Sequence, residues 1–230
     1  MVKMHLKRLA APKSWQISRK STKFIVRPFP GSHGFEYGTS LATLLTDITK
    51  IVSNSSDLRS ILRNKSVLVD GVARTHPRFF VGLFDTIDLP LIKKSFRLSI
   101  SKRGFLEALP ISADESKLKV SKIISKTYQK GGSVQLNLHD GTNLVLKDST
   151  HNKGDSLVLQ LPGRVPHEHL KMEKDALVFL TGGIHQGVIG KIIEIKGKLL
   201  KLSLKEKVVE TPKEYAIVVG KNKPSITVVN

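Results

Sequence analysis

The chain has 230 residues, and its 38 lysine and arginine residues against 19 acidic residues give a formal net charge of +19. A surface with this excess repels itself unless a polyanion neutralises it, and we expect that polyanion to be nucleic acid rather than an anionic membrane. No apolar run approaches the roughly 20 residues of a membrane-spanning helix. The absence of cysteine excludes disulfides, thiolate metal sites and cysteine nucleophiles.

Residues 1–38 are predicted to form an extended basic arm. The first acidic residue is Glu36, and Pro12, Pro28 and Pro30 interrupt any long helix. This pattern favours a nucleic-acid-binding arm over a mitochondrial transit peptide, which would be an amphipathic helix; a solvated, flexible tail is the other alternative. The candidates for phosphate contact and base stacking are Lys3, His5, Lys7, Arg8, Lys13, Trp15, Arg19 and Lys20.

A small α+β unit is predicted over residues 39–107. Leucine and isoleucine residues repeat at three- and four-residue steps over 41–53, which predicts an amphipathic helix. Either Thr39 or Ser40 is expected to cap it. A second helix is expected to follow, with Ser56 as its N-cap.

A hairpin and a further strand are expected to complete this unit. Asp70-Gly71 after an apolar run is a strong hairpin turn. Residues 96–100 alternate apolar side chains with Arg97 and a serine, which predicts a half-buried strand. The basic residues of the unit are candidates for phosphate contact, and a merely solvated basic surface is the alternative for each. They are Arg59, Arg63, Lys65, Arg74, Arg78, Lys102 and Arg103.

Two small β-barrels are predicted at 108–170 and 171–215, followed by a C-terminal segment at 216–230. Helical periodicity is lost there, and short apolar runs are separated by glycine-containing turns. Lysines that alternate with apolar residues on the first barrel would bind phosphate or would only block edge pairing of strands. The candidates in these segments are Lys119, Lys122, Lys191, Lys221 and Lys223.

A glycine-rich stretch in the second barrel raises the question of phosphate binding. Gly182 and Gly187 have the spacing of a Walker loop, but Val188 stands where the lysine belongs. The following residues are β-branched, so we expect a strand rather than a helix N-terminus. The glycines are therefore predicted to shape a turn. Gly183, Gly187 and Gly190 resemble the loop of the KOW motif, which lies on SH3-like barrels.

Several segments together resemble one family. Leu62-Arg-Asn-Lys-Ser-Val-Leu-Val-Asp-Gly-Val72 resembles the ribosomal S-four-type RNA-binding domain, in which two helices pack on a hairpin. His5-Leu-Lys-Arg-Leu-Ala-Ala-Pro-Lys-Ser-Trp15 and Val218-Val-Gly-Lys-Asn-Lys-Pro224 resemble the opening and closing segments of the eukaryotic and archaeal small-subunit ribosomal protein S-four, e-type family. The end at Asn230, without a longer basic tail, favours the archaeal type.

The resemblance implies a structural component of the small ribosomal subunit, made of three modules, that binds ribosomal RNA. It implies neighbouring small-subunit proteins as partners and a cytoplasmic location on the ribosome, with nucleolar passage during assembly only in a eukaryotic source. Neither catalysis nor a cofactor is implied. We expect no small-molecule substrate, no membrane association and no homo-oligomer.

Two other functions remain open at this stage. A pseudouridine-synthase-like enzyme with an S-four-type module would carry an Arg-Leu-Asp catalytic segment, whereas this chain has Gly163-Arg-Val-Pro166. A transcription or assembly factor with a KOW barrel would bind RNA transiently and pair with a protein partner. A metal site is not expected, because the histidines of His167-Glu-His169 are closer in sequence than a zinc-binding helix requires.

Overall fold

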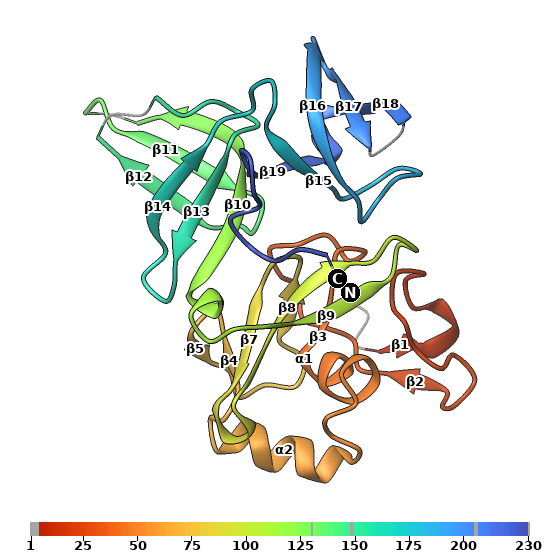
Figure 1. The fold of residues 1–230 in the computed structure, drawn as a ribbon. Coiled ribbons are helices and arrows are strands. Elements are labelled where there is room, and N and C mark those ends of the chain that lie inside the picture. The colour runs from red at the N-terminus through yellow and green to blue at the C-terminus, as the bar shows by residue number, and fades with distance from the viewer. Residues whose placement is uncertain (1–4, 130, 148–149, 205–206, 230) are drawn as a thin grey trace. The chain divides into compact units, whose positions relative to one another are not determined.

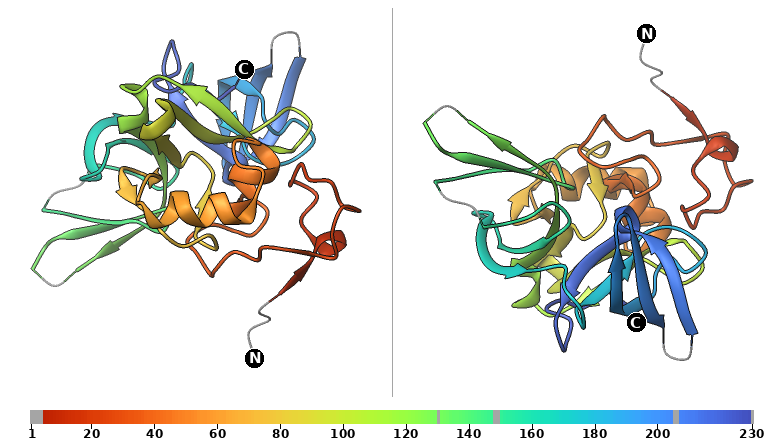
Figure 2. Two further views of the ribbon diagram at one scale, coloured as in Figure 1. Left: turned by 90° about the horizontal axis from the view of Figure 1, so that it is seen from below. Right: turned by 90° about the horizontal axis from the view of Figure 1, so that it is seen from above.

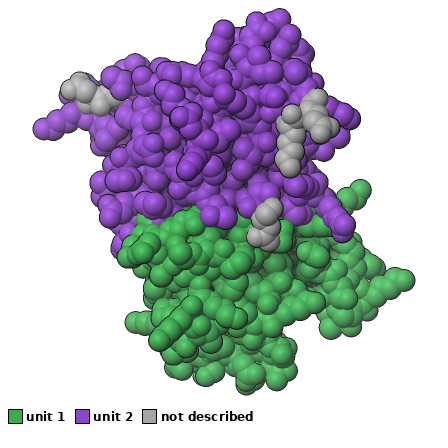
Figure 3. Space-filling model, in the orientation of Figure 1, with its two compact units in different colours: residues 1–99, 104–117 green, residues 100–103, 118–230 purple. Residues whose placement is uncertain are grey.

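The protein is mostly β-structure with a few short helices (Figure 1). The structure, a computed structural model, describes residues 5–129, 131–147, 150–204 and 207–229. The chain divides into two compact units, residues 1–99 with 104–117 and residues 100–103 with 118–230 (Figure 3). Across these ranges, no helix is long and apolar enough to span a bilayer.

The N-terminal elements form three β-sheets with short helical segments between the strands. Strands β1 and β2 pair with each other, as do β3 and β6, and a five-stranded sheet has the order β5-β4-β7-β8-β9. In chain order the elements are β1 Leu6–Lys7, η1 Arg8–Ala10, β2 Phe24–Ile25, β3 Gly38–Ser40, α1 Leu41–Thr43, η2 Leu44–Ile48, α2 Ser55–Arg63, β4 Leu68–Val69, β5 Val72–Ala73, β6 Phe80–Gly82, β7 Thr86–Leu89, η3 Pro90–Ile92, β8 Lys94–Ile100, β9 Leu106–Ile111 and η4 Glu115–Lys117.

The expected extended arm is folded back on itself. Leu6 of β1 pairs with Ile25 of β2, and both side chains are buried. Figure 2 shows this segment, in red, as a closed loop. Trp15 is 1% exposed, and its indole Nε1 donates a hydrogen bond to the Gly38 carbonyl at 2.9 Å. The arm is therefore part of the core of the first unit.

The first helical segment is shorter than predicted. Ser40 caps it, because its hydroxyl accepts a hydrogen bond from the Thr43 N–H at 3.2 Å. The predicted helix over 41–53 ends at Ile48, after one α-helical turn and a π-helical segment. Lys50 has a φ of +52°, a left-handed conformation that an α-helix does not continue through.

The second helix, α2, also begins earlier than predicted. Ser56 lies inside it, and the N-cap residue is Asn54, whose backbone is extended and whose carbonyl accepts from the Leu58 N–H at 3.1 Å. Leu58 and Leu62 bury the apolar face. The helix ends because Lys65 takes a φ of +54°, as residues just past helix C-termini often do.

The hairpin turn is confirmed, but the half-buried strand is not. Asp70 and Gly71 have φ values of +52° and +73° between β4 and β5, as a type I′ turn requires. In β8, however, Arg97 is fully buried, as are Leu98, Ser99 and Ile100 after it. Its guanidinium forms an ion pair with Glu115 of η4 and donates to the Glu115 carbonyl at 3.0 Å. Because a paired arginine tolerates burial, the alternating pattern does not report solvent exposure here.

The C-terminal unit contains two five-stranded antiparallel sheets, ordered β12-β11-β10-β13-β14 and β18-β17-β16-β15-β19. The strand β19 comes from the predicted C-terminal segment and lies beside β15. The elements are β10 Leu118–Tyr128, β11 Val134–Leu138, β12 Asn143–Leu146, β13 Ser156–Gln160, β14 Val165–Leu170, β15 Leu177–Leu180, β16 Ile189–Lys196, β17 Leu199–Leu204, β18 Lys207–Pro212, η5 Lys213–Tyr215 and β19 Ala216–Gly220.

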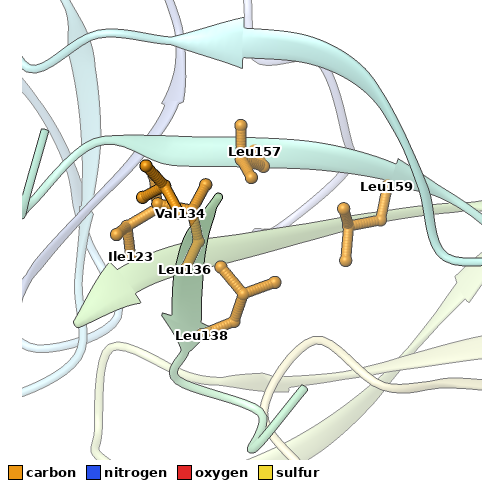
Figure 4. Close-up of a cluster of buried hydrophobic side chains, with 6 residues drawn as sticks. All are labelled: Ile123, Val134, Leu136, Leu138, Leu157 and Leu159. Carbon is orange, nitrogen blue, oxygen red and sulfur yellow. The ribbon is translucent and has the colours of Figure 1, made fainter. Parts of the chain in front are cut away.

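Strand β10 organises the first of these two sheets. Its first half, Leu118 to Lys122, pairs with β13, and its second half, from Ile123 on, pairs with β11, with an irregularity in the β11 pairing between Ile123 and Ser125. Because β10 pairs with both β11 and β13, apolar side chains of the three strands meet in one core (Figure 4). That core consists of Ile123, Val134, Leu136, Leu138, Leu157 and Leu159.

Candidate nucleic-acid interface

Most of the basic candidates are exposed, but several are not. The exposed ones are His5, Lys7, Lys13, Lys20, Arg59, Arg63, Lys65, Lys102, Arg103, Lys191, Lys221 and Lys223. The partly buried ones are Arg19, Arg74 and Arg78. The buried ones are Arg8, Lys119 and Lys122, and the stacking candidate Trp15 is buried as well. Lys3 lies outside the described residues.

Two candidates of the arm have structural roles instead. The Arg8 guanidinium forms a salt bridge with Asp47 of η2, with 2.6 Å between Nη2 and Oδ1, and also donates to the Ser18 carbonyl at 2.9 Å. Arg19 donates to the carbonyls of Ala11 and Pro12 at 2.9 and 2.8 Å. These two arginines hold the arm in its folded loop. With Trp15 buried as well, we leave Arg8, Trp15 and Arg19 out of the interface.

The C-terminal end of α2 carries an accessible cluster of cations. Arg59 and Arg63 lie one helical turn apart, as their spacing predicts, and Lys65 follows directly after the helix. All three are exposed, and within the described ranges no ion pair joins any of them to a carboxylate. Cations at a helix C-terminus also interact favourably with its dipole. This cluster, Arg59, Arg63 and Lys65, can neutralise backbone phosphates.

Two further arginines lie over aromatic rings. The Arg78 guanidinium carbon is 4.5 Å from the centre of the Phe29 ring, and that of Arg74 is 4.4 Å from the Phe79 ring. Phe24, Phe29 and Phe35 are all at least 37% exposed. None of these three rings was expected from the sequence to stack a base. The sequence feature that could have indicated stacking here is the interleaving of phenylalanine with lysine and arginine over residues 23–35.

The two lysine candidates of β10 are buried and face inward. The Lys119 ammonium lies 3.2 Å from the Asp140 carboxylate, and both side chains are almost completely buried. Burial alone raises the pKa of Asp140, but Lys119, the charge of His139 and the Thr142 N–H together lower it to about 2. A buried, compensated charge of this kind is not available to bind RNA.

Lys122 fills a similar structural role. Its ammonium donates to the backbone carbonyls of Lys213 and Glu214, at 2.7 and 3.0 Å, and so joins β10 to η5. Burial lowers the pKa of Lys122, Glu214 opposes the shift and the charge of Lys153 adds to it, and together they bring this pKa to about 8. We therefore leave Lys119 and Lys122 out of the interface.

The glycine loop between β15 and β16 is a turn and leads into a strand. Gly187 has a φ of +75°, its N–H donates to the Leu180 carbonyl at 2.7 Å, and a Cβ there would collide with the Ser101 carbonyl. At Gly190 a Cβ would lie 2.7 Å from the Leu204 side chain, whereas Gly183, with a φ of +84°, has open space around it. Because β16 follows, no helix N-terminus points at this loop.

The remaining lysines of the second unit differ in their surroundings. Lys191 forms a 2.8 Å ion pair with Asp175, and the hydrogen bond within this pair lowers the pKa of Asp175. Both side chains are more than half exposed, so this pair contributes little to stability and partly offsets the lysine charge. Lys221 and Lys223 are exposed on a tight bend that is closed by the bridge between Gly220 and Pro224.

Comparison with known proteins gives consistent matches along the chain. The family described as "Ribosomal family S4e" matches residues 92–165, and the one described as "RS4NT (NUC023) domain" matches residues 2–36. The small ribosomal subunit protein eS4 of Methanocella arvoryzae is 39% identical over 230 residues, 96% of each chain. That of Archaeoglobus fulgidus is 38% identical over 227 residues, 96% of this chain and 95% of its own.

A solved structure agrees with these matches. The crystal structure of the 30S ribosomal protein S4e from Thermoplasma acidophilum has a TM-score of 0.73 and 26% sequence identity, and the alignment covers 83% of this chain and 99% of that one. The sequence relatives match almost the entire chain, and the solved structure shares its fold over the aligned 83%. The chain belongs to the family of the small ribosomal subunit protein eS4.

Proposed function

We propose that this protein is a structural constituent of the small ribosomal subunit that binds ribosomal RNA and supports subunit assembly and translation. The observation that carries the proposal is the match over 96% of both chains to a protein named small ribosomal subunit protein eS4. The family consists of structural components and not enzymes, so the pseudouridine-synthase-like alternative is set aside. The named relatives are archaeal, so the proposal does not include passage through a nucleolus.

The proposed mechanism is the neutralisation of phosphates by cations on both units. In this mechanism RNA backbone from more than one helix is bound, without readout of base sequence. The cations proposed to contact RNA are those whose side chains reach the surface. They are His5, Lys7, Lys13, Lys20, Arg59, Arg63, Lys65, Arg74, Arg78, Lys102, Arg103, Lys191, Lys221 and Lys223.

The finer architecture belongs to the same proposal. Residues 39–107 would be an S-four-type RNA-binding domain, residues 108–170 a central barrel and residues 171–215 an SH3-like barrel of the KOW type. What supports this is the order of elements: two helical segments before a hairpin, then two five-stranded antiparallel sheets. Neighbouring small-subunit proteins are the proposed protein partners, and the cytoplasmic ribosome is the proposed location.

The test is the salt dependence of binding to small-subunit ribosomal RNA. Replacing Arg59, Arg63 and Lys65 together by alanine should weaken binding and reduce the slope of log affinity against log salt by about two units, because each lost phosphate contact removes about 0.7 to 0.9. Filter binding at a series of potassium chloride concentrations measures both quantities.

A matched control removes the same charge from ion-paired positions. Lys117, Lys196 and Lys201 each lie within 4 Å of a carboxylate, at 3.2, 3.6 and 3.5 Å from Asp114, Glu194 and Glu210 respectively. Their triple alanine variant should keep most of the affinity and slope. Equal losses in the two variants would show that net charge alone matters, and no loss in the first variant would exclude the α2 cluster as a contact.

A further inference from the structure

Two loops of the first unit bring together a cluster of two aromatic rings and one guanidinium. Phe29 lies in the arm, and His76 and Arg78 lie between β5 and β6. The Phe29 and His76 ring centres are 4.5 Å apart with the planes tilted by 43°, and the Arg78 guanidinium carbon is 4.5 Å from the Phe29 centre. We call these three residues the Phe29 cluster.

Hydrogen bonds of backbone and side-chain groups hold the Phe29 cluster in place. The Phe29 N–H donates to the Arg78 carbonyl at 2.8 Å, and the Arg78 Nε donates to the Arg27 carbonyl at 2.8 Å. The Arg78 N–H donates to Nδ1 of His76 at 3.1 Å, which fixes the imidazole ring as well. Each member of the cluster is therefore tied to another or to the adjoining arm. Such preorganisation lowers the entropy that these side chains lose when a ligand binds.

The rings of the cluster face water although apolar burial would stabilise them. Phe29 is 40% exposed and His76 is exposed, whereas Trp15 in the same arm is 1% exposed. Exposed aromatic rings beside cations present flat faces together with positive charge. A planar, electron-poor or anionic ligand fits such a surface.

The charge around the cluster is positive and uncompensated. Within the described part of the chain, no carboxylate forms an ion pair with Arg27 or Arg78. A second pair of the same kind lies next to it, because the Arg27 guanidinium carbon is 5.8 Å from the centre of the 37% exposed Phe35 ring. The ligand of this surface must therefore be able to supply negative charge as well as a flat face.

We propose that the Phe29 cluster stacks an unpaired base of RNA while the adjacent arginines contact its phosphates. This inference rests on the proposed function and deepens it, by naming single-stranded RNA as the ligand of one surface. A base within a duplex presents only its edges to a protein, so a stacking surface selects unpaired nucleotides. A protein partner of similar shape would lack the phosphates that match the cations.

Substitution of Phe29 in the full-length chain tests the proposal. Phe29→Leu keeps an apolar side chain and the backbone hydrogen bond but removes the aromatic face. It should weaken binding of a single-stranded oligouridylate of twelve nucleotides about tenfold, the order expected for loss of one stacked base. Binding of a twelve-base-pair RNA duplex should stay unchanged. Phe29→Tyr, which retains the ring, should bind both RNAs like the unmodified chain.

Two further readouts separate stacking from general damage. A 2-aminopurine in the single strand should lose fluorescence on binding the unmodified chain and Phe29→Tyr, but much less on binding Phe29→Leu. Leu91→Ala, which changes a 71% exposed apolar residue of η3, is the matched surface control and should behave like the unmodified chain. Thermal unfolding by circular dichroism compares the folded states.

The possible results distinguish failure of the stacking proposal from failure of the proposed function. Unchanged single-strand affinity for Phe29→Leu, or an equal loss on the duplex, overturns the stacking proposal. Unchanged affinity together with poor incorporation into small subunits assigns the cluster to a protein partner and overturns it too. If the unmodified chain binds neither RNA at low salt, the proposed function itself fails. Normal salt-dependent binding of ribosomal RNA with no effect at Phe29 refutes only this inference.

Discussion

Replacing Lys119 by methionine should destabilise the protein without weakening RNA binding. The substitution leaves the Asp140 carboxylate buried without its 3.2 Å ammonium partner. Loss of one partner of a buried pair costs about 3 to 5 kcal/mol. Asp140 keeps hydrogen bonds from the Ser121 hydroxyl at 3.1 Å and the Thr142 N–H at 3.0 Å, so we expect a loss near 3 kcal/mol, on the order of the lower limit.

The pH dependence gives the same prediction a second readout. Because the pKa of Asp140 is lowered to about 2 from the ordinary 3.8, its contribution is fully present above pH 3.8 and is lost as the pH falls through 2. At about 1.4 kcal/mol per pKa unit, this contribution is roughly 2 kcal/mol. In Lys119→Met the pKa of Asp140 should rise, so stability should decline at a higher pH.

Urea unfolding at pH 7 and across the acid range measures both effects. The double variant Lys119→Met with Asp140→Asn should recover much of the loss, because the uncompensated charge is gone. Ribosomal RNA affinity, measured where each variant is folded, should match that of the unmodified chain. A clear fall in RNA affinity with unchanged unfolding would refute the assignment of Lys119 to the core.

Three other predictions concern Trp15, Lys122 and the glycine loop. Trp15→Ala should lower the free energy of unfolding by about 3 to 5 kcal/mol, because it empties a buried site, and a loss below about 1 kcal/mol would mean the arm is not packed. Because the pKa of Lys122 is lowered to about 8, the unfolded chain binds more protons than the folded one between pH 8 and 10.5. The free energy of unfolding, compared with that of Lys122→Met, should therefore rise by about 3 kcal/mol across this range. A difference between the two proteins that does not change with pH would contradict this. Gly187→Ala should cost about 2 kcal/mol or more in urea unfolding because of its φ and the Ser101 carbonyl, while Gly183→Ala, in open space, should cost about 1.

Local sequence rules predicted the elements that short-range chemistry determines. The Ser40 cap and the Asp70-Gly71 turn depend on residues within a few positions of each other, and the structure has both. The β-branched run after the glycine loop forms a strand, β16, as expected. The end of the first helical segment was missed because it depends on the left-handed backbone of Lys50, a conformation that lysine rarely signals in sequence.

Burial of charge could not be predicted from the local pattern. The alternating pattern predicts that Arg97 lies on the exposed face of its strand. The side chain is instead buried against Glu115, which lies eighteen positions later in the sequence. Arg8 is paired with Asp47 across thirty-nine positions, and Lys119 with Asp140 across the sheet. A basic residue in a strongly cationic chain looks like an RNA contact until its distant partner is known.

Stacking residues were harder to predict than charges. Trp15 is the single tryptophan and was the obvious stacking ring, but the folded arm buries it. Phe29 lies in a stretch that interleaves phenylalanine with lysine and arginine, but a phenylalanine in a proline-rich segment is equally compatible with a small core. Only the structure shows that its ring stays exposed beside Arg78.

Reconstitution of the small subunit tests the central claim most directly. Small-subunit ribosomal RNA and the other subunit proteins would be assembled without this protein, the labelled chain added, and particles separated on a gradient at moderate salt. The account predicts that the chain sediments with the particles in stoichiometric amount and stays bound after a salt wash. A chain that washes away while the particles assemble normally would contradict it.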